Sequence, residues 1–201
     1  YKHLNKKFGK NGYAKSYCHD EELENFKTIV EQVLANKYYF GIKYMEVNQI
    51  TDIKTQAQLF AIMAHHNQVR KSEPEKPYLV HPIGVGKLLE ELGYDDNVVA
   101  AGYLHDVIED TKYKASDLKK EFNEDIVKLV LDATELDKKL SWEVRKEDTI
   151  QRVKNLPLRS KLVICADKIN NLEALFLKFA TTGTRDFTAF KRGEEKQCWY
   201  Y

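Results

Sequence analysis

Four ionisable side chains interrupt an otherwise apolar stretch of this 201-residue chain. Residues 98–110 are apolar except for His105, Asp106, Glu109 and Asp110. Burying such groups is costly unless something compensates, and a metal ion is an obvious compensator. On a helix, residues four apart lie within about 40° of each other. We therefore expect one turn to offer metal ligands, and the next turn to offer carboxylates for proton transfer.

The sequence pattern predicts helices in most of the rest of the chain. Four prolines and nine glycines leave few breaks, and the apolar residues recur with a helical period nearly throughout. We predict an all-α fold, a compact bundle of several helices with the metal site between them. The expected helices are Thr51–His66, one from Pro82 to Leu92, one capped by Asp95 or Asp96 that carries His105, a short one opening at Ser116 or Asp117, one from Asn123, Trp142–Asn155 capped by Ser141, and a long one opened by Pro157.

The domain organisation follows from length and pattern. A chain of 201 residues suits one domain with a sizeable core, with room for an extension. We expect residues 1–49 to be an N-terminal extension of unknown role, partly helical over residues 20–36. Residues 50–201 then form the main domain.

Composition excludes some functions. The 32 basic and 31 acidic residues give a net charge of +1, which argues against a general nucleic-acid binder. Cys18, Cys165 and Cys198 are odd in number and lack a CxxC spacing, which favours a reducing compartment, here the cytoplasm. No apolar run approaches the roughly 20 residues that span a bilayer. The chain starts at Tyr1 without a Met, so a removed signal stays open.

Two distant residues extend the metal-ligand set. His81 precedes Pro82, and Asp167 interrupts a second apolar run, so both can join His105 and Asp106. Two imidazoles and two carboxylates make a mixed nitrogen and oxygen set. Four protein ligands would saturate a tetrahedral zinc ion but leave two positions on an octahedral ion, which favours Mn²⁺ first and Fe²⁺ or Mg²⁺ next. Alternatively, His81 is a capping or core histidine and Asp167 a buried hydrogen-bonding carboxylate.

Several blocks of sequence carry a family resemblance. They are Ala64–Lys71, Pro77–Pro82, Leu104–Thr111, Ser141–Lys146, Ala166–Leu172 and the tail Phe190–Tyr201. Through them the chain resembles the HD-domain metal-dependent phosphohydrolases. Within these it is most similar to the small stand-alone RelA/SpoT-type hydrolases of (p)ppGpp. The resemblance covers roughly residues 50–201.

The resemblance implies a reaction and roles. Such enzymes remove the 3′-pyrophosphate of guanosine tetra- or pentaphosphate (ppGpp or pppGpp) and release GDP or GTP, with Mn²⁺. It assigns the metal to His81, His105, Asp106 and Asp167. Glu109 and Asp110 would orient and activate the water and handle protons. Alternatively, Glu109 and Asp110 form only a solvated, acidic end of a helix.

The resemblance also implies substrate contacts. Arg70 would stack on the base, since a planar guanidinium suits stacking, and Lys71 would contact a phosphate. Asn171 matches a substrate-side asparagine. Arg145 and Lys146 could reach the phosphates, although a plain amphipathic surface helix explains them equally well.

The chain departs from the family pattern at two places, and the second of these leaves the identity of the substrate undecided. Asn67 stands where a glycine is usual, and Glu173-Ala174 stand where a basic or hydroxyl residue is expected. The second departure puts strict guanine preference in doubt. The alternatives are another nucleotide, such as an adenosine alarmone, NADPH or a deoxynucleotide, or a nucleotide-binding regulatory module without turnover. A homo-oligomer and a partner for residues 1–49 also stay open.

Overall fold

The structure is a computed structural model that describes residues 52–70, 73–135, 138–183, 187, 190 and 192–201. The extension expected at residues 1–49, its helix over 20–36 and Lys71 lie outside the described residues. Among the described helices, none has both the length and the apolar character that a bilayer span requires.

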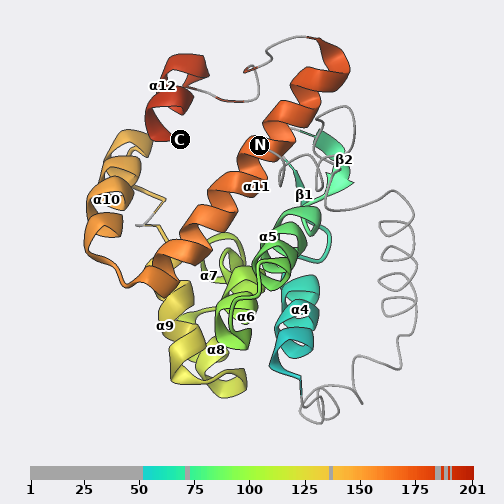
Figure 1. Cartoon of the computed structure of the whole chain (residues 1–201), viewed down its shortest axis with the longest axis vertical. Helices are drawn as coiled ribbons and strands as arrows, with labels where there is room; N and C mark the ends of the chain where they lie inside the picture. Colours follow the sequence, from blue (N-terminus) through green and yellow to red (C-terminus); the bar gives the residue numbers. More distant parts are fainter. Residues whose placement is uncertain (1–51, 71–72, 136–137, 184–186, 188–189, 191) are drawn as a thin grey trace.

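The described part of the chain is mostly helical, which confirms the predicted all-α class (Figure 1). The helices are α4 (Ile53–Ala64), α5 (Val80–Glu91), α6 (Asp96–Leu104), α7 (Val107–Asp110), α8 (Ala115–Glu121), α9 (Glu124–Ala133), α10 (Trp142–Asn155), α11 (Leu158–Thr182) and α12 (Gly193–Tyr200). A small antiparallel ribbon, β1 (Val69–Arg70) with β2 (Glu73–Pro77), was not predicted.

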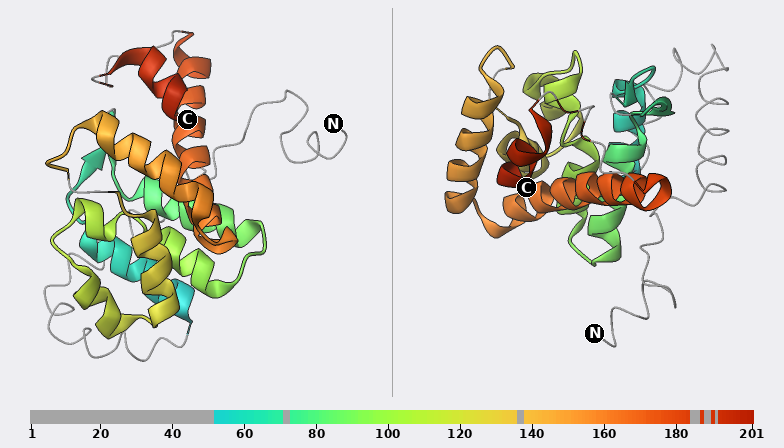
Figure 2. Two further views of the ribbon diagram at one scale, coloured as in Figure 1. Left: turned by 90° about the vertical axis from the view of Figure 1, so that its left-hand side faces the viewer. Right: turned by 90° about the horizontal axis from the view of Figure 1, so that it is seen from above.

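Helix α6 lies at the centre of the bundle. Every residue from Val98 to Leu104 is buried, and α6 packs against α4, α5, α9 and α11. A helix that is apolar on all sides has to be surrounded in this way. The two views of Figure 2 show α11 crossing the bundle, with α10 and α12 on the outside. The chain leaving α6 therefore emerges next to α5 and α11.

Two glycines allow α5 and α6 to approach closely. A Cβ atom on Gly86 would lie 2.3 Å from the Tyr103 ring, and one on Gly102 would lie 2.6 Å from Leu89 Cδ1. Neither space is large enough for a side chain. This crossing brings the start of α5 near the end of α6.

The sequence predicts most helix starts but places two too late, because α5 begins at Val80 rather than at Pro82 and α8 also begins early. Asp95 caps α6 as expected, because its carboxylate accepts the Val98 N–H. Helix α8 begins at Ala115, before the predicted Ser116 or Asp117. The reason is that Asp117 lies inside the first turn and its carboxylate reaches back to the Lys114 N–H at 3.0 Å.

The expectation that one helix carries both His105-Asp106 and Glu109-Asp110 is wrong. Helix α6 ends at Leu104 and α7 begins at Val107, so His105 and Asp106 form the turn between them. The ideal spacing of four residues along one helix therefore does not apply here.

The departure at Asn67 has a structural explanation. Its φ is +66°, in the left-handed region that glycine enters without strain. Asparagine is among the residues that tolerate this region best. The turn between α4 and β1 thus keeps a conformation that suits glycine.

We expect Gly86→Ala to destabilise the fold by about 1–3 kcal/mol, because the added methyl group overpacks the contact with Tyr103. Alanine has the higher helix propensity, so propensity alone predicts the opposite sign. Urea denaturation gives the free energy of unfolding. As a control, exposed Glu91→Ala on the same helix should stay within about 0.5 kcal/mol of wild type. A Gly86→Ala variant as stable as wild type would contradict the packing argument.

Candidate metal centre

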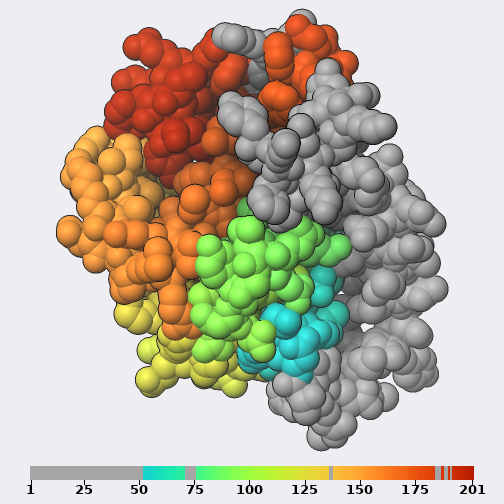
Figure 3. All heavy atoms as spheres, in the orientation of Figure 1, coloured from blue at the N-terminus to red at the C-terminus, as the bar shows by residue number. Residues whose placement is uncertain are grey.

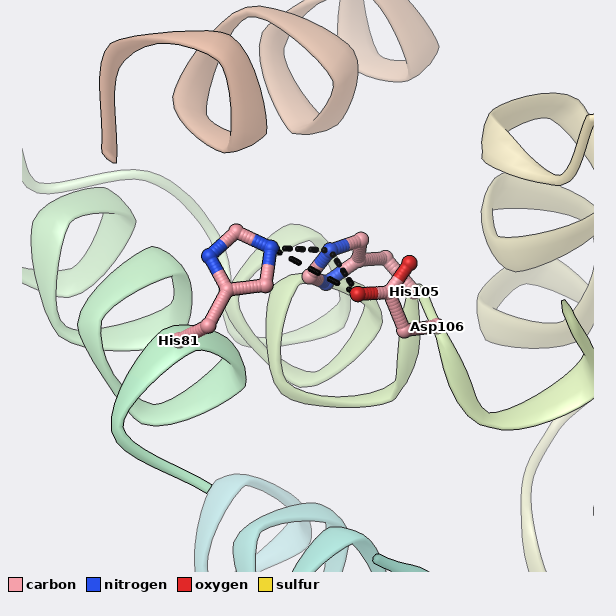
Figure 4. Close-up of side chains that lie close together, drawn as sticks. All are labelled: His81, His105 and Asp106. Carbon is pink, nitrogen blue, oxygen red and sulfur yellow. Dashed lines mark hydrogen bonds and ion pairs between the residues drawn. The ribbon is translucent and has the colours of Figure 1, made fainter. Parts of the chain in front are cut away.

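The structure brings together the four side chains that the sequence predicts as ligands. His81 lies in the first turn of α5, His105 and Asp106 lie in the α6–α7 turn, and Asp167 lies on α11. His81 Nε2 is 3.2 Å from His105 Nε2, 3.4 Å from Asp106 Oδ2 and 3.1 Å from Asp167 Oδ1. Figure 4 shows the two rings directed toward each other and toward the Asp106 carboxylate.

The outer nitrogens of the two imidazoles fix how the rings point. His105 Nδ1 donates to the Gly102 carbonyl at 2.8 Å, and His81 Nδ1 lies 2.8 Å from Asn170 Oδ1. Since a carbonyl oxygen can only accept, Nδ1 carries the proton in each ring. In the neutral rings, each Nε2 then directs a lone pair into the centre, as in metal-bound histidines.

The donor set fits a cation. Both histidines are buried, with 3% and 4% of His81 and His105 exposed. Two nitrogen lone pairs and two carboxylate oxygens at these distances repel one another unless a positive charge lies among them. Among the described residues, the ligand atoms of His81, His105 and Asp106 lie within 4.8 Å of one another, close enough to hold one metal ion. Asp167 Oδ1 is 3.1 Å from His81 Nε2 and adds a fourth donor atom, the second oxygen of the set.

The pKa values report the same convergence. Burial alone would lower the pKa of His81, but its contacts with Asp106 and Asp167 raise it to about 9. Burial alone would raise the pKa of Asp106, yet the imidazoles of His105 and His81 hold it well below its usual range. The centre is therefore strongly selective for positive charge.

Asp167 is shared between the centre and a lysine. Its Oδ1 faces His81 and also accepts from Asn171 Nδ2 at 2.6 Å. Its Oδ2 accepts from Lys168 Nζ at 2.7 Å. Against the effect of burial, the charge of Lys168 lowers the pKa of Asp167.

The sequence analysis gave no role to Tyr78. Its hydroxyl donates to Asp106 Oδ2 at 2.5 Å and lies 3.1 Å from Asp110 Oδ2. It therefore joins a candidate ligand to a candidate acid–base residue. Its position three residues before His81 was the available signal, but the contact is between segments far apart in the chain.

Glu109 and Asp110 occupy different surroundings. Glu109 lines a cavity beside the four candidate ligands, whereas Asp110 lies outside its lining. Burial raises the pKa of Glu109, and the charges of Asp106 and Glu135 raise it further. Asp110 accepts from Tyr78 and pairs with Lys138. Of the two acids, Glu109 has the environment of a proton carrier.

The predicted substrate contacts are only partly brought together. The cavity measures about 190 Å³, and its lining includes Arg70, Asn171 and Lys146. Arg70 Nη2 donates to Asn171 Oδ1 at 3.3 Å. Arg145 is not part of the lining, because its guanidinium is directed to Glu135 at 2.8 Å. Lys71 lies outside the described residues.

Further lining residues were given no role in the sequence analysis: Tyr78, Glu135, Tyr200 and Tyr201. The last two come from α12 and the residue after it, at the far end of the chain. The tail Phe190–Tyr201 was noted only for its resemblance. Its place beside the cavity depends on tertiary packing, which no local pattern encodes.

Comparison with known proteins gives a consistent family. A model described as HD domain matches residues 57–186. The Drosophila melanogaster protein named guanosine-3′,5′-bis(diphosphate) 3′-pyrophosphohydrolase MESH1 is 36% identical over 150 residues, covering 74% of this chain and 78% of the relative. A Haemophilus influenzae protein named guanosine-3′,5′-bis(diphosphate) 3′-pyrophosphohydrolase is 35% identical over 118 residues, covering 56% of this chain but 17% of that longer protein.

Two solved structures are also similar. A crystal structure of a Listeria monocytogenes EGD-e protein has a TM-score of 0.57 and 39% identity, covering 60% of this chain and 77% of that one. A structure titled as a metazoan ortholog of SpoT that hydrolyzes ppGpp has a TM-score of 0.59 and 35% identity, covering 63% and 72%. With its all-α fold and its histidine–aspartate centre, the chain belongs to the HD-domain family.

Proposed function

We propose that this protein is a metal-dependent phosphohydrolase. It removes the 3′-pyrophosphate of guanosine tetra- or pentaphosphate, releasing GDP or GTP and pyrophosphate. The observation that carries the proposal is the convergence of four candidate ligand atoms beside Glu109. The lining of this cavity also includes the positively charged side chains of Arg70, Lys146 and Lys168. Relatives named for this activity support the choice of substrate. We assign the activity to the domain formed by residues 50–201, and we expect it in the cytoplasm.

His81, His105, Asp106 and Asp167 would hold the metal. A bound divalent ion lowers the pKa of water and offsets phosphoryl charge, which makes hydrolysis possible near neutral pH. We propose Mn²⁺, because four protein ligands leave two positions on an octahedral ion, with Fe²⁺ or Mg²⁺ as alternatives. Tyr78 supports the centre through its hydrogen bond to Asp106 Oδ2.

Glu109 would move the proton. Its Oε2 lies 3.4 Å from the Glu135 N–H, which orients the carboxylate. Its raised pKa suits a group that takes a proton from water and passes it to the leaving oxygen. Asp110, bound to Tyr78 and Lys138, would keep this acidic turn in place.

The cavity divides its charge in a way that suits a nucleotide with phosphates. Asp106, Asp167 and Glu109 lie at the metal end, while Lys146 and Lys168 lie toward α12. We propose that Arg70 stacks on the base with Asn171 beside it, and that Lys146 contacts phosphate. Lys71 keeps the phosphate role that the resemblance implies. Arg145 would act through Glu135, which it orients.

The direct test is ppGpp turnover by the purified full chain with Mn²⁺, read as released GDP and pyrophosphate. We expect Glu109→Gln to lower kcat by about 100-fold or more, because general acid–base catalysis contributes roughly that much. The same variant should bind Mn²⁺ as wild type does. Full turnover by Glu109→Gln would contradict the proton-transfer role.

The same assay separates the substrates. Adenosine alarmones, NADPH and deoxynucleotides are compared with ppGpp at equal concentration. Preference for one of these would overturn the guanosine proposal and keep the phosphohydrolase. Tight ppGpp binding without turnover would instead favour a regulatory module.

Removal of one ligand should abolish metal binding and activity together. We expect Asp106→Ala to weaken Mn²⁺ binding by more than about 100-fold, since even residues behind the ligands contribute 10- to 100-fold. Free Mn²⁺ measured by electron paramagnetic resonance gives the affinity. The variant Glu124→Ala, at an exposed position on α9, serves as the control and should bind normally. Unchanged affinity in Asp106→Ala would place the metal elsewhere.

A further inference from the structure

Helix α12 places the ring of Tyr200 beside two lysine side chains that line the cavity. Lys146 Nζ, from α10, lies 4.4 Å from the centroid of the Tyr200 ring, and Lys168 Nζ, from α11, lies 4.9 Å from it. All three residues line the cavity beside the metal centre. Figure 1 shows α12 next to α10 and α11, and in Figure 3 the C-terminal residues border the surface of these helices.

The ring offsets a local repulsion. Two ammonium groups gathered around one side chain repel each other, and burial disfavours each charged form. Burial lowers the pKa of Lys146, and the nearby charge of Lys168 lowers it further, while Glu135 acts in the opposite direction. The face of an aromatic ring carries negative potential and attracts cations most strongly when water is excluded. The Tyr200 ring therefore helps to hold both lysine side chains in one place.

Each lysine shares its carboxylate partner with another group. Glu135 pairs with both Arg145 and Lys146, and Asp167 pairs with Lys168. Arg145 lies outside the cavity lining, so at this end Lys146 and Lys168 face Glu135 and Asp167. The Tyr200 hydroxyl, at 3.5 Å from Glu135 Oε1, adds no charge. Asp167 also faces the two histidines, so its charge is shared with the centre. Neither lysine therefore has a carboxylate to itself, and an anion that contacts both can complete the balance of charge.

Helix α12 has other anchors, so Tyr200 is not needed simply to hold it. The Trp142 and Trp199 rings lie 6.0 Å apart, and Arg192 Nε bonds Glu143 Oε1 at 2.7 Å. Tyr200 itself touches Trp142 at 6.1 Å, but it is the member of this group that reaches the cavity.

We propose that Tyr200 is a positioning residue that presents Lys146 and Lys168 together as a binding pair for a diphosphate group. Helix α12 then completes the basic end of the cavity. The identity of the anion, a diphosphate of the nucleotide, rests on the proposed function. The pairing of the two lysines around the ring rests on the geometry alone.

The test uses the full chain with Tyr200→Leu, which removes the ring, and Tyr200→Phe, which keeps it. Trp199→Leu is the matched control, because Trp199 lies on the same helix but outside the cavity lining. The probe is inorganic pyrophosphate, titrated calorimetrically into metal-free protein in the presence of a chelator. We expect Tyr200→Leu to weaken binding by about tenfold, and Tyr200→Phe and Trp199→Leu to change it by less than about threefold.

Kinetics give the second measurement. For ppGpp with Mn²⁺, Tyr200→Leu should raise KM by about tenfold and leave kcat within about twofold, since the metal end is untouched. An equal loss in Trp199→Leu would overturn the proposal, because it would show that α12 docking alone matters. Unchanged pyrophosphate affinity in Tyr200→Leu would also overturn it.

The outcomes separate this inference from the proposed function. Pyrophosphate binding that depends on Tyr200, without ppGpp turnover by wild type, would support the lysine pair and reject the substrate. Normal turnover with no effect of Tyr200→Leu on KM or on pyrophosphate affinity would reject the lysine pair and keep the function.

Discussion

Two buried imidazole nitrogens lie 3.2 Å apart, and in the neutral rings each has its proton on the opposite nitrogen, which faces a carbonyl oxygen. This arrangement is unfavourable without a cation between them, and much of the bundle serves to hold it. The glycine contacts at Gly86 and Gly102 bring α5 and α6 together, and the Gly102 carbonyl also orients His105. Asn170 on α11 orients His81 in the same way. The helices that build the core are thus the helices that build the centre.

The cavity beside this centre extends the same electrostatic logic. Asp106 and Asp167 lie against the histidines, and Glu109 lies where burial and neighbouring negative charge favour its protonated form. The lysines of the cavity gather around Tyr200, at the side closed by α12. Asp167 and Lys168 are adjacent in sequence and paired at 2.7 Å, so they connect the two ends. A substrate that carries phosphates can be held at one end while the metal end acts on it.

The sequence indicated these candidate ligands because His105, Asp106 and Asp167 interrupt apolar runs. His81 was expected just before a helix, whereas it lies in the first turn of α5. His105 and Asp106 interrupt one buried stretch, and Asp167 interrupts another. The family resemblance supplied the roles. Local pattern did not reveal the turn that separates α6 from α7, since apolar residues continue on both sides of it. Nor did it reveal Tyr78 or Tyr200, whose contacts join segments distant in the chain. The sequence left Arg145 either as a phosphate contact or as part of a plain amphipathic surface helix, and in the structure its guanidinium is directed to Glu135.

The central claim is that His81, His105, Asp106 and Asp167 bind one metal ion. Crystals of the full chain grown with Mn²⁺, with diffraction data collected on both sides of the manganese absorption edge, test it directly. The account predicts one anomalous peak in contact with both Nε2 atoms and one oxygen of each carboxylate. A peak at another place, or a well-ordered centre with the two histidines bonded only to the carboxylates and no peak among them, would contradict it.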